Sequence, residues 1–203
     1  MNPVERAYNP AHTEDTMVPV TALWLPILLS AVIVFVASSI IHMVLPFHRK
    51  DYKPVPSEDG VMQALRRFNI PPGDYLMPCP TGPSGMKDPA FLEKRTKGPV
   101  LMMTVMPSGP VSMGSSLGQW FVYCVVVGIF AGYVAGAALS PGAPYLAVFR
   151  FVGTVAFVGY SLASWQNTIW YKRSWAITLR TTIDGLIYGM LSAGTFGWLW
   201  PKG

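Results

Sequence analysis

Two residues of opposite charge, Arg180 and Asp184, stand in the otherwise apolar run TLRTTIDGLIYG. A spacing of four places both on one face of a helix, where a guanidinium and a carboxylate can pair. Counted from Ser174 at about 1.5 Å per residue, they would lie roughly 9 Å and 15 Å inside a membrane. Arg150, counted from the opposite end of a neighbouring span, would come within side-chain reach of Asp184. Because a charge at the bilayer centre costs at least about 2.5 kcal/mol, we predict an intramembrane cluster of Arg150, Arg180 and Asp184.

Three roles are open for this charge cluster. Its excess positive charge would attract a lipid phosphate, an anionic substrate or an acidic residue of a partner subunit. Asp184 would instead serve in transport or in a proton relay, as intramembrane acids do in pumps and transporters. The simplest role is structural, in which the arginines reach toward the membrane surfaces and Asp184 locks two helices together. We favour the structural role.

Histidine, cysteine and methionine raise the question of a metal or cofactor. His42 and His48 follow the first apolar run, but one histidine within the spans is too few for the bis-His ligation of a b-type haem, although one suffices for other haems and for pigments. Cys79 lies among methionines such as Met77, and thiolate with thioether ligands selects Cu(I). The methionine spacing is irregular, however, and methionine also fills gaps at adaptable surfaces. We expect no metal or cofactor, with His42, Cys79 and Met77 as the weak candidates.

Small residues recur at every fourth position in two apolar runs. They are Gly128, Gly132 and Gly136 in one run, and Gly185, Gly189 and Ala193 in the other. Residues at this spacing share a helix face and let two backbones approach closely, which is how membrane helices associate. We predict that both faces pack against helices, of this chain or of a partner subunit. A channel lining is the less favoured alternative.

The elements that carry these residues follow from the composition. Hydrophobic residues make up 51% of the 203 residues and charged residues 12%, against about 25% charged residues in a soluble domain. Four apolar runs are long enough for the roughly 30 Å hydrocarbon core of a bilayer, residues 21–45, 117–139, 144–165 and 174–200. The first is too long for a cleaved signal peptide and follows acidic rather than basic residues. The fold class is therefore an all-α integral membrane protein with four transmembrane helices.

The direction of the spans follows from the basic residues, which are retained on the cytoplasmic side. Nine of the fifteen lie between the first two spans and two more follow the third, whereas the opposite side holds Arg6 and Lys202. Both termini, including a polar tail over residues 1–20, are therefore predicted to lie outside. Tryptophans near both ends of the apolar runs suit the two interfaces of a bilayer.

Residues 46–116 would form a cytoplasmic insertion between the first and second spans. Ser57 before EDGVMQALRRF is typical of a helix N-cap, and DPAFLEKRTK predicts a second short helix that ends at Gly98. PVLMMTVM predicts a strand or a segment lying at the interface, and Pro-rich stretches such as PPGDYLMPCPTGPSG predict turns. With so few aliphatic residues, we expect this segment to pack on itself and on the membrane face rather than around a core of its own.

Several strings occur together in this chain: HMVLPFHRKDY, PPGDYLMPCP, APYLAVFRFVGTVAF and WQNTIWYKRSWAITLRTTIDGLIYG. In these strings the chain resembles a family of small bacterial inner-membrane proteins with four transmembrane helices and no established function. The resemblance covers most of the chain from residue 20 onward. It implies a bacterial inner-membrane setting and supplies no catalytic or binding residues.

The function that these observations favour is that of a non-catalytic accessory or interaction subunit of a bacterial membrane protein complex. Its partners would be other membrane protein subunits and anionic lipids, bound through the small-residue helix faces and the basic inner segment, and not nucleic acid. We expect no enzyme, because no zinc ligand set, nucleophile elbow, P-loop or dinucleotide-binding motif is present. A small transporter or channel centred on Asp184 and Arg180 is the alternative, and a metal- or pigment-binding membrane protein is the further alternative.

Overall fold

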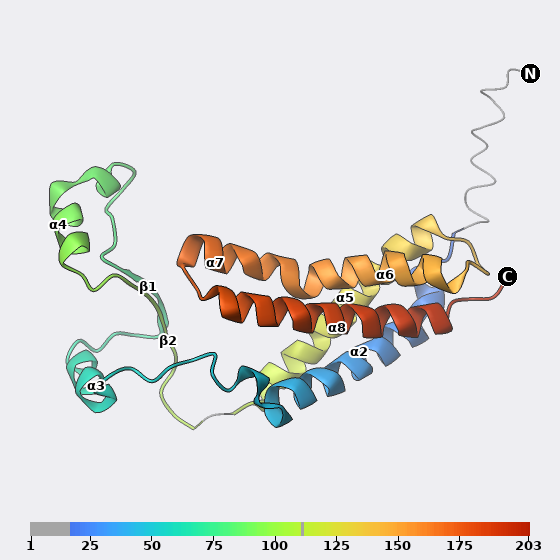
Figure 1. The fold of residues 1–203 in the computed structure, drawn as a ribbon, viewed down its shortest axis with the longest axis horizontal. Coiled ribbons are helices and arrows are strands. Elements are labelled where there is room, and N and C mark those ends of the chain that lie inside the picture. Colours follow the sequence, from blue (N-terminus) through green and yellow to red (C-terminus); the bar gives the residue numbers. More distant parts are fainter. Residues whose placement is uncertain (1–16, 111) are drawn as a thin grey trace, which may run out of the picture. The chain divides into compact units, whose positions relative to one another are not determined.

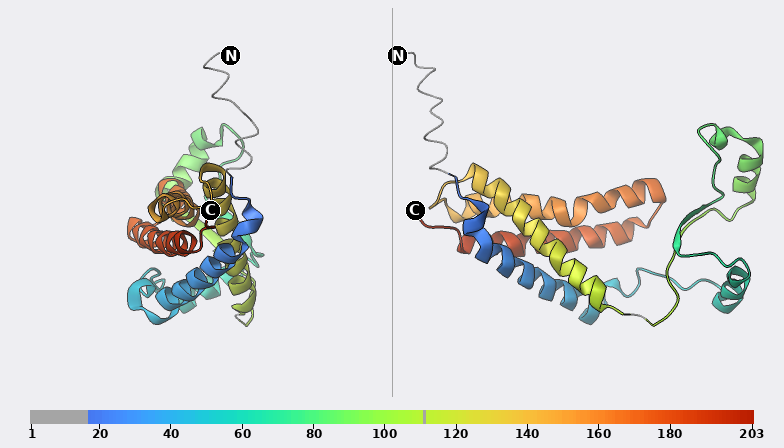
Figure 2. Two further views of the ribbon diagram at one scale, coloured as in Figure 1. Left: turned by 90° about the vertical axis from the view of Figure 1, so that its right-hand side faces the viewer. Right: turned by 180° about the vertical axis from the view of Figure 1, so that it is seen from behind.

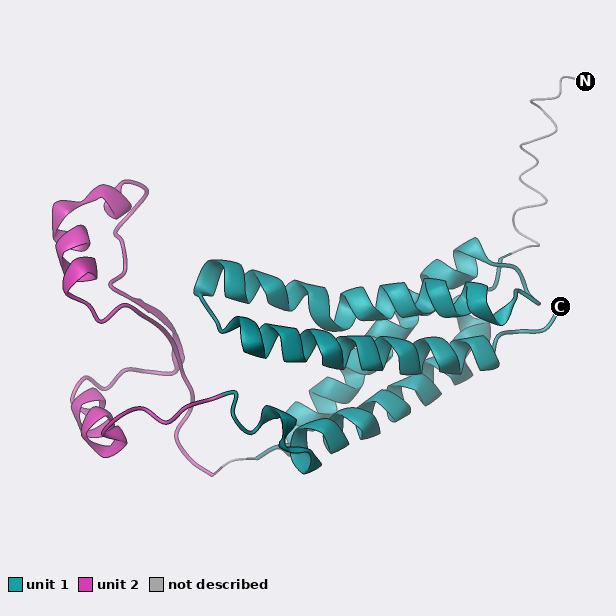
Figure 3. Ribbon diagram, viewed as in Figure 1, with its two compact units in different colours: residues 1–51, 112–203 teal, residues 52–111 magenta. Residues whose placement is uncertain are grey.

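The computed structural model describes residues 17–110 and 112–203, and 67% of the protein is helical (Figure 1). Most of the polar tail predicted over residues 1–20 therefore lies outside the described residues. The chain divides into two compact units (Figure 3). We call residues up to Asp51 together with Ser112–Gly203 the helical unit, and Tyr52–Val111 the inserted unit.

Within the described residues, the helical unit contains five α-helices and several short turns of other helix types. Its α-helices are α2 (Trp24–Ser39), α5 (Gly114–Ala138), α6 (Tyr145–Ser161), α7 (Trp165–Tyr171) and α8 (Trp175–Trp198). Short 3-10 turns cover Val20–Leu23, Pro46–His48 and Leu162–Ser164, and a π-helical turn covers Ile40–Val44. Each range predicted as a span overlaps one of the long helices, although α5 begins three residues before the predicted 117, and the third helical segment continues past residue 165 through α7.

Three helical segments are long and apolar enough to cross a membrane, as expected of a multi-pass membrane protein. They are Val20–Val44, Gly114–Ala138 and Tyr145–Tyr171. Helix α8 has a comparable length of 24 residues. It is less apolar because it carries Arg180, Asp184 and several threonines.

The helices of this unit pack side by side around two apolar clusters. Helix α6 runs along α8 for most of its length, and α5 contacts both α2 and α6 (Figures 1 and 2). One cluster is formed by Val18, Leu23, Ile27, Ala131, Ala135, Val148, Val152, Phe196 and Trp200, and the other by Ala31, Val34, Ile41, Cys124 and Tyr188. Trp200 also donates its indole N–H to the carbonyl of Ser140 at 3.0 Å, which joins the end of α8 to the α5–α6 linker.

The small-residue face of α5 packs against other segments of the same chain. A Cβ atom on Gly128 would lie 3.4 Å from Ile27 of α2, and one on Gly132 would lie 3.2 Å from Phe196 of α8. The closest approach is at Gly136, whose carbonyl accepts a hydrogen bond from the Val18 N–H at 3.0 Å. A Cβ atom there would come within 2.2 Å of the Val18 carbonyl oxygen.

The small-residue face of α8 packs in the same way against α6. A Cβ atom on Gly185 would lie 2.5 Å from that of Ser161, and one on Gly189 would lie 3.2 Å from the Gly153 carbonyl oxygen. The Ala193 side chain is fully buried and lies next to Gly153. Six small residues thus bring α5 and α8 into close contact with segments of this chain.

These contacts predict opposite effects for two alanine substitutions in α5. Gly136→Ala should lower the free energy of unfolding by about 1–3 kcal/mol, because the new methyl group meets backbone atoms that cannot turn away. Gly118→Ala meets nothing within 4 Å, so it should be neutral or stabilising by up to about 1 kcal/mol through its higher helix propensity. Thermal unfolding of both variants in the same detergent measures the difference. Equal melting temperatures would contradict the close approach at Gly136.

The inserted unit consists of two short helices and a β-hairpin, and it is described by itself. Helix α3 covers Glu58–Arg66, helix α4 covers Pro89–Lys97, and a 3-10 turn covers Gly85–Lys87. Strands β1 (Gly73–Met77) and β2 (Leu101–Val105) pair antiparallel, with Tyr75 opposite Met103. The strand β1 lies in a stretch for which the sequence predicted only turns.

The caps of the two helices in this unit agree with the sequence prediction to different degrees. Ser57 occupies the N-cap position of α3, as predicted, but it has a φ of 54° and its side chain makes no capping hydrogen bond. Asp88 caps α4, because its carboxylate accepts a hydrogen bond from the Ala90 N–H at 3.0 Å. Gly98 ends α4 with a φ of 65°, a backbone conformation that favours glycine.

Candidate metal centre

Five polar side chains from distant parts of the sequence meet at one end of α2. They are His42, His48 and Asp51, which follow α2, and Arg180 and Asp184, which lie on α8. Four of them, all except His42, have side chains that are 4–29% exposed. All five belong to the helical unit.

The chain after α2 is bent so that it returns to α8. The π-helical turn Ile40–Val44 holds His42, and π-helical turns occur frequently at functional sites. The residue before Pro46 is extended, as proline requires of its predecessor, and the 3-10 turn Pro46–His48 follows. This turn brings the His48 ring over the His42 ring, with centroids 4.3 Å apart and planes 4° apart.

Both imidazole rings use Nδ1 to donate a hydrogen bond. His48 Nδ1 lies 2.6 Å from Asp51 Oδ2, and His42 Nδ1 lies 3.0 Å from the carbonyl oxygen of Ser38. A carboxylate and a carbonyl can only accept, so these contacts assign the proton of each neutral ring to Nδ1. The lone pair of each ring is then at Nε2, the arrangement found in metal-ligating histidines that donate their other N–H to a carboxylate or carbonyl.

Asp184 faces the free nitrogen of His48. Asp184 Oδ2 lies 2.9 Å from His48 Nε2, yet the pair lacks the alignment of a hydrogen bond, and both Nε2 and Asp184 Oδ1 are buried without a hydrogen-bond partner. Leaving a buried polar atom unpaired costs about 1–3 kcal/mol. If His48 Nε2 carries no proton, it and the Asp184 carboxylate are two electron-pair donors, which a proton or a metal ion between them would hold together.

Asp51 holds this arrangement in place through both of its oxygens. Oδ2 accepts from His48, and Oδ1 binds the Arg180 guanidinium. Burial alone would raise the pKa of Asp51, but the hydrogen bonds and charges of His48 and Arg180 outweigh it and lower the pKa below the ordinary value of 3.8. The carboxylate is therefore ionised and keeps the His48 proton on Nδ1.

The donor atoms lie near the spacing that one shared metal ion requires. One ligand atom each from His42, His48 and Asp184 lies within 4.8 Å of the other two. Two adjacent ligands of a six-coordinate ion, each bound at about 2.1 Å, are about 3.0 Å apart. The 2.9 Å between His48 Nε2 and Asp184 Oδ2 fits that spacing. Two imidazoles and one carboxylate suit zinc and non-haem iron(II).

The predicted cluster of Arg150, Arg180 and Asp184 does not form among the described residues. Arg180 binds Asp51 instead of Asp184, and no ion pair of Arg150 occurs in this part of the chain. Arg150 lies midway between Val148 and Val152, which are fully buried, and residues two positions apart point to nearly opposite sides of a helix. Its side chain lines a separate hollow with Phe149 and Met190.

The other predicted metal candidates lie elsewhere. Met77 and Cys79 line a pocket of the inserted unit together with Asp88 and Lys94. Cys79 is exposed and Cys124 is buried, and both are free. Among the described residues, one group of side chains has the spacing for a metal ion. It contains His42 but neither Met77 nor Cys79. His48 and Asp51 are the residues of the cluster that sequence reasoning did not assign.

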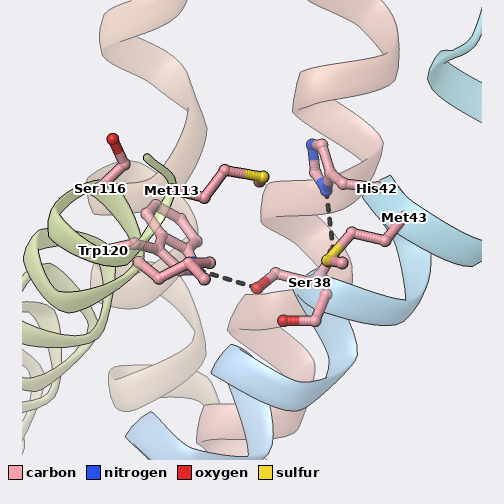
Figure 4. A pocket seen from close by; sticks show the side chains of 8 residues that line it. Ser38, His42, Met43, Met113, Ser116 and Trp120 are labelled. Carbon is pink, nitrogen blue, oxygen red and sulfur yellow. Dashed lines mark hydrogen bonds between the residues drawn. The ribbon is translucent and has the colours of Figure 1, made fainter. Parts of the chain in front are cut away.

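A cavity of about 290 Å³ opens beside His42, between the end of α2 and the start of α5. Its lining residues are Ser38, Ser39, His42, Met43, Met113, Ser116, Leu117 and Trp120. Figure 4 shows the Trp120 indole directed at the Ser38 hydroxyl, to which it donates at 2.8 Å. His42 is thus shared by the polar cluster and by this mostly apolar cavity.

Comparison with family models, with curated proteins and with solved structures found no match. The site must therefore be judged from its own geometry.

The role of Asp51 can be tested by comparing two ion pairs. Asp51→Asn should lower the free energy of unfolding by about 1–3 kcal/mol, because it leaves the partly buried Arg180 without its counter-charge. Glu93→Gln breaks an exposed pair with Lys97, whose side chains are 64% and 73% exposed, and should have no measurable effect. Thermal or denaturant unfolding distinguishes the two. An Asp51→Asn variant as stable as Glu93→Gln would contradict the anchoring role.

Proposed function

We propose that this protein is an integral membrane protein that binds one divalent transition-metal ion through His42, His48 and Asp184. The carrying observation is the pair formed by His48 Nε2 and Asp184 Oδ2, which lie 2.9 Å apart without hydrogen-bond alignment. A bound ion would accept electron pairs from both atoms. Of the functions that the sequence left open, metal binding is the one with an assembled set of donors.

The ligand chemistry limits the choice of ion. Imidazole nitrogen binds zinc, iron, copper and nickel well, whereas magnesium and calcium prefer oxygen ligands. One carboxylate with two imidazoles leaves open coordination positions on zinc or iron(II). The cavity beside His42 supplies room for an exchangeable ligand at such a position.

Binding requires one movement of the side chains. The two histidine rings lie parallel, so their in-plane lone pairs do not meet at one point. His48 is held by Asp51, whereas His42 lies at an exposed position. The ion would therefore tilt the His42 ring toward His48 and Asp184, so that donor separations of up to 4.8 Å shorten to about 3 Å.

We further propose that α8 is a fourth span, because its two faces suit a lipid environment. Leu179, Ile183, Leu186 and Met190 are exposed at helical spacing along one side. The opposite side buries polar residues, including Asp184, Ser192 and Thr195. Trp175 and Trp198, at its two ends, are 52% and 81% exposed, as tryptophans at membrane interfaces are.

The orientation proposed is that of the positive-inside rule, with both termini outside the cytoplasm of a bacterium and the inserted unit inside. The metal centre would then lie toward the cytoplasmic side. The role we propose for the chain is that of a non-catalytic subunit. The small-residue faces of α5 and α8 meet segments of this chain, which leaves the inserted unit as the surface for an interaction function.

Metal analysis of the purified protein tests the proposal. Protein loaded with Zn²⁺ or Fe²⁺ should retain close to one ion per chain after removal of free metal, and Mg²⁺ should not compete. His48→Gln and Asp184→Asn should each remove a ligand and abolish retention. Asp51→Asn should weaken binding about 10- to 100-fold, as loss of a carboxylate that orients a ligating histidine does. Elemental analysis and equilibrium titration give these values.

Asp74→Asn is the matched control, because Asp74 accepts a hydrogen bond from Thr104 in the inserted unit and is not part of the cluster. It should retain the ion fully. Retention that survives both His48→Gln and Asp184→Asn, or no retention by the unmodified chain, would overturn the proposal. Metal uptake by proteoliposomes that Asp184→Asn abolishes would extend metal binding to the transport alternative centred on Asp184 and Arg180.

A further inference from the structure

The inserted unit has almost no interior. Among its described residues, from Tyr52 to Pro110, only Gly85 is buried. Short helices and a two-stranded hairpin are not stable in water without a surface to cover their apolar sides. The unit therefore needs an apolar surface beyond its own residues.

Helix α3 carries the apolar side that would contact this surface. Val61, Met62, Leu65 and Phe68 recur at helical spacing on one face and are 38–73% exposed. Gln63 lies on the opposite side of the helix. An apolar stripe on an otherwise polar helix is typical of helices that lie in the plane of a membrane interface.

Arg66, at the end of α3, borders this apolar stripe, whereas Arg67, in the cap position, follows Gln63 by four residues and lies toward the polar side. The aliphatic stem of Arg66 can lie along acyl chains while its guanidinium group binds a phosphate. The first turn carries Glu58 and Asp59, so the cations are concentrated at the end of the helix that is followed by Phe68. A negatively charged leaflet fits this distribution.

The bilayer is the surface that the chain itself brings within reach. Six residues, Tyr52 to Ser57, link α3 to Asp51, and they can span at most about 20 Å. Asp51 is bound to Arg180 in the helical unit, seven residues after the apolar segment Val20–Val44 ends. The far end of the inserted unit leads directly into the apolar helix α5.

We propose that α3 binds the surface of the bilayer, with Met62 and Phe68 among the acyl chains and Arg66 on the phosphates of anionic lipids. This binding is independent of the metal centre. The apolar face of α3 is covered by the lipid leaflet nearest the inserted unit, and the test distinguishes this leaflet from a second copy of the chain.

Site-directed fluorescence in the full-length chain tests this proposal. In a Cys79→Ser background, cysteine is placed at Met62 on the apolar face or at Gln63 on the polar face and labelled with an environment-sensitive dye. The background protein alone measures any labelling of the buried Cys124. Each protein is reconstituted in vesicles of phosphatidylcholine, with or without phosphatidylglycerol.

The dye at position 62 should emit at shorter wavelength, be quenched by spin-labelled lipid and be shielded from iodide, whereas the dye at position 63 should show the reverse. Phosphatidylglycerol should strengthen the effect, and Arg66→Gln should reduce the inserted population about fivefold in these vesicles. Equal iodide quenching at both positions would overturn the proposal. So would shielding at position 62 that lacks lipid quenching and increases with protein density, which would indicate a second copy of the chain.

Discussion

The contact of Asp51 with Arg180 and His48 is the interaction on which the polar end of the bundle depends. It joins residues 129 positions apart in the sequence and uses both oxygens of one carboxylate. One oxygen fixes the returning chain to α8, and the other fixes the protonated nitrogen of His48. Without this contact nothing would fix the orientation in which His48 Nε2 faces Asp184, and the residues after α2 could follow another path.

The surroundings of Asp184 follow from the unusual distribution of polarity on α8. In a soluble protein a helix buries its apolar side, but α8 exposes leucine, isoleucine and methionine and buries an aspartate, a serine and two threonines beside Tyr188 and Phe196. A lipid environment reverses the ordinary preference, because hydrocarbon accepts the apolar side and excludes the polar one. Buried hydroxyls bond to carbonyls one turn earlier, as Thr195 does to Leu191 at 2.8 Å. The carboxylate of Asp184 cannot do this, and it lies against His48 instead.

The sequence predicted the helices well and the site only in part. Length and hydropathy located the long helices, because the thickness of a bilayer sets both. The spacing of small residues indicated the close contacts of α5 and α8. The partner of Arg180 was missed because it depends on the path of residues 45–51, which no periodicity reveals. The absence of Arg150 from the cluster could have been predicted. Val148, Val152 and Ala156 form the buried stripe of α6, and Arg150 falls outside that stripe. Strand β1 was missed because glycine and proline crowd its ends.

The π-helical turn at Ile40–Val44 makes the direction of the two histidines sensitive to the loss of a single residue. A π turn contains one residue more than an α turn, and losing that residue would shorten the first apolar segment very little. The side chains beyond it would nevertheless rotate by about 100° around the helix axis. A related chain lacking this extra residue would cross the membrane equally well, yet its two histidines would point in a new direction. Length at this one turn, rather than the identity of the ligands, would then separate chains that hold an ion from chains that do not.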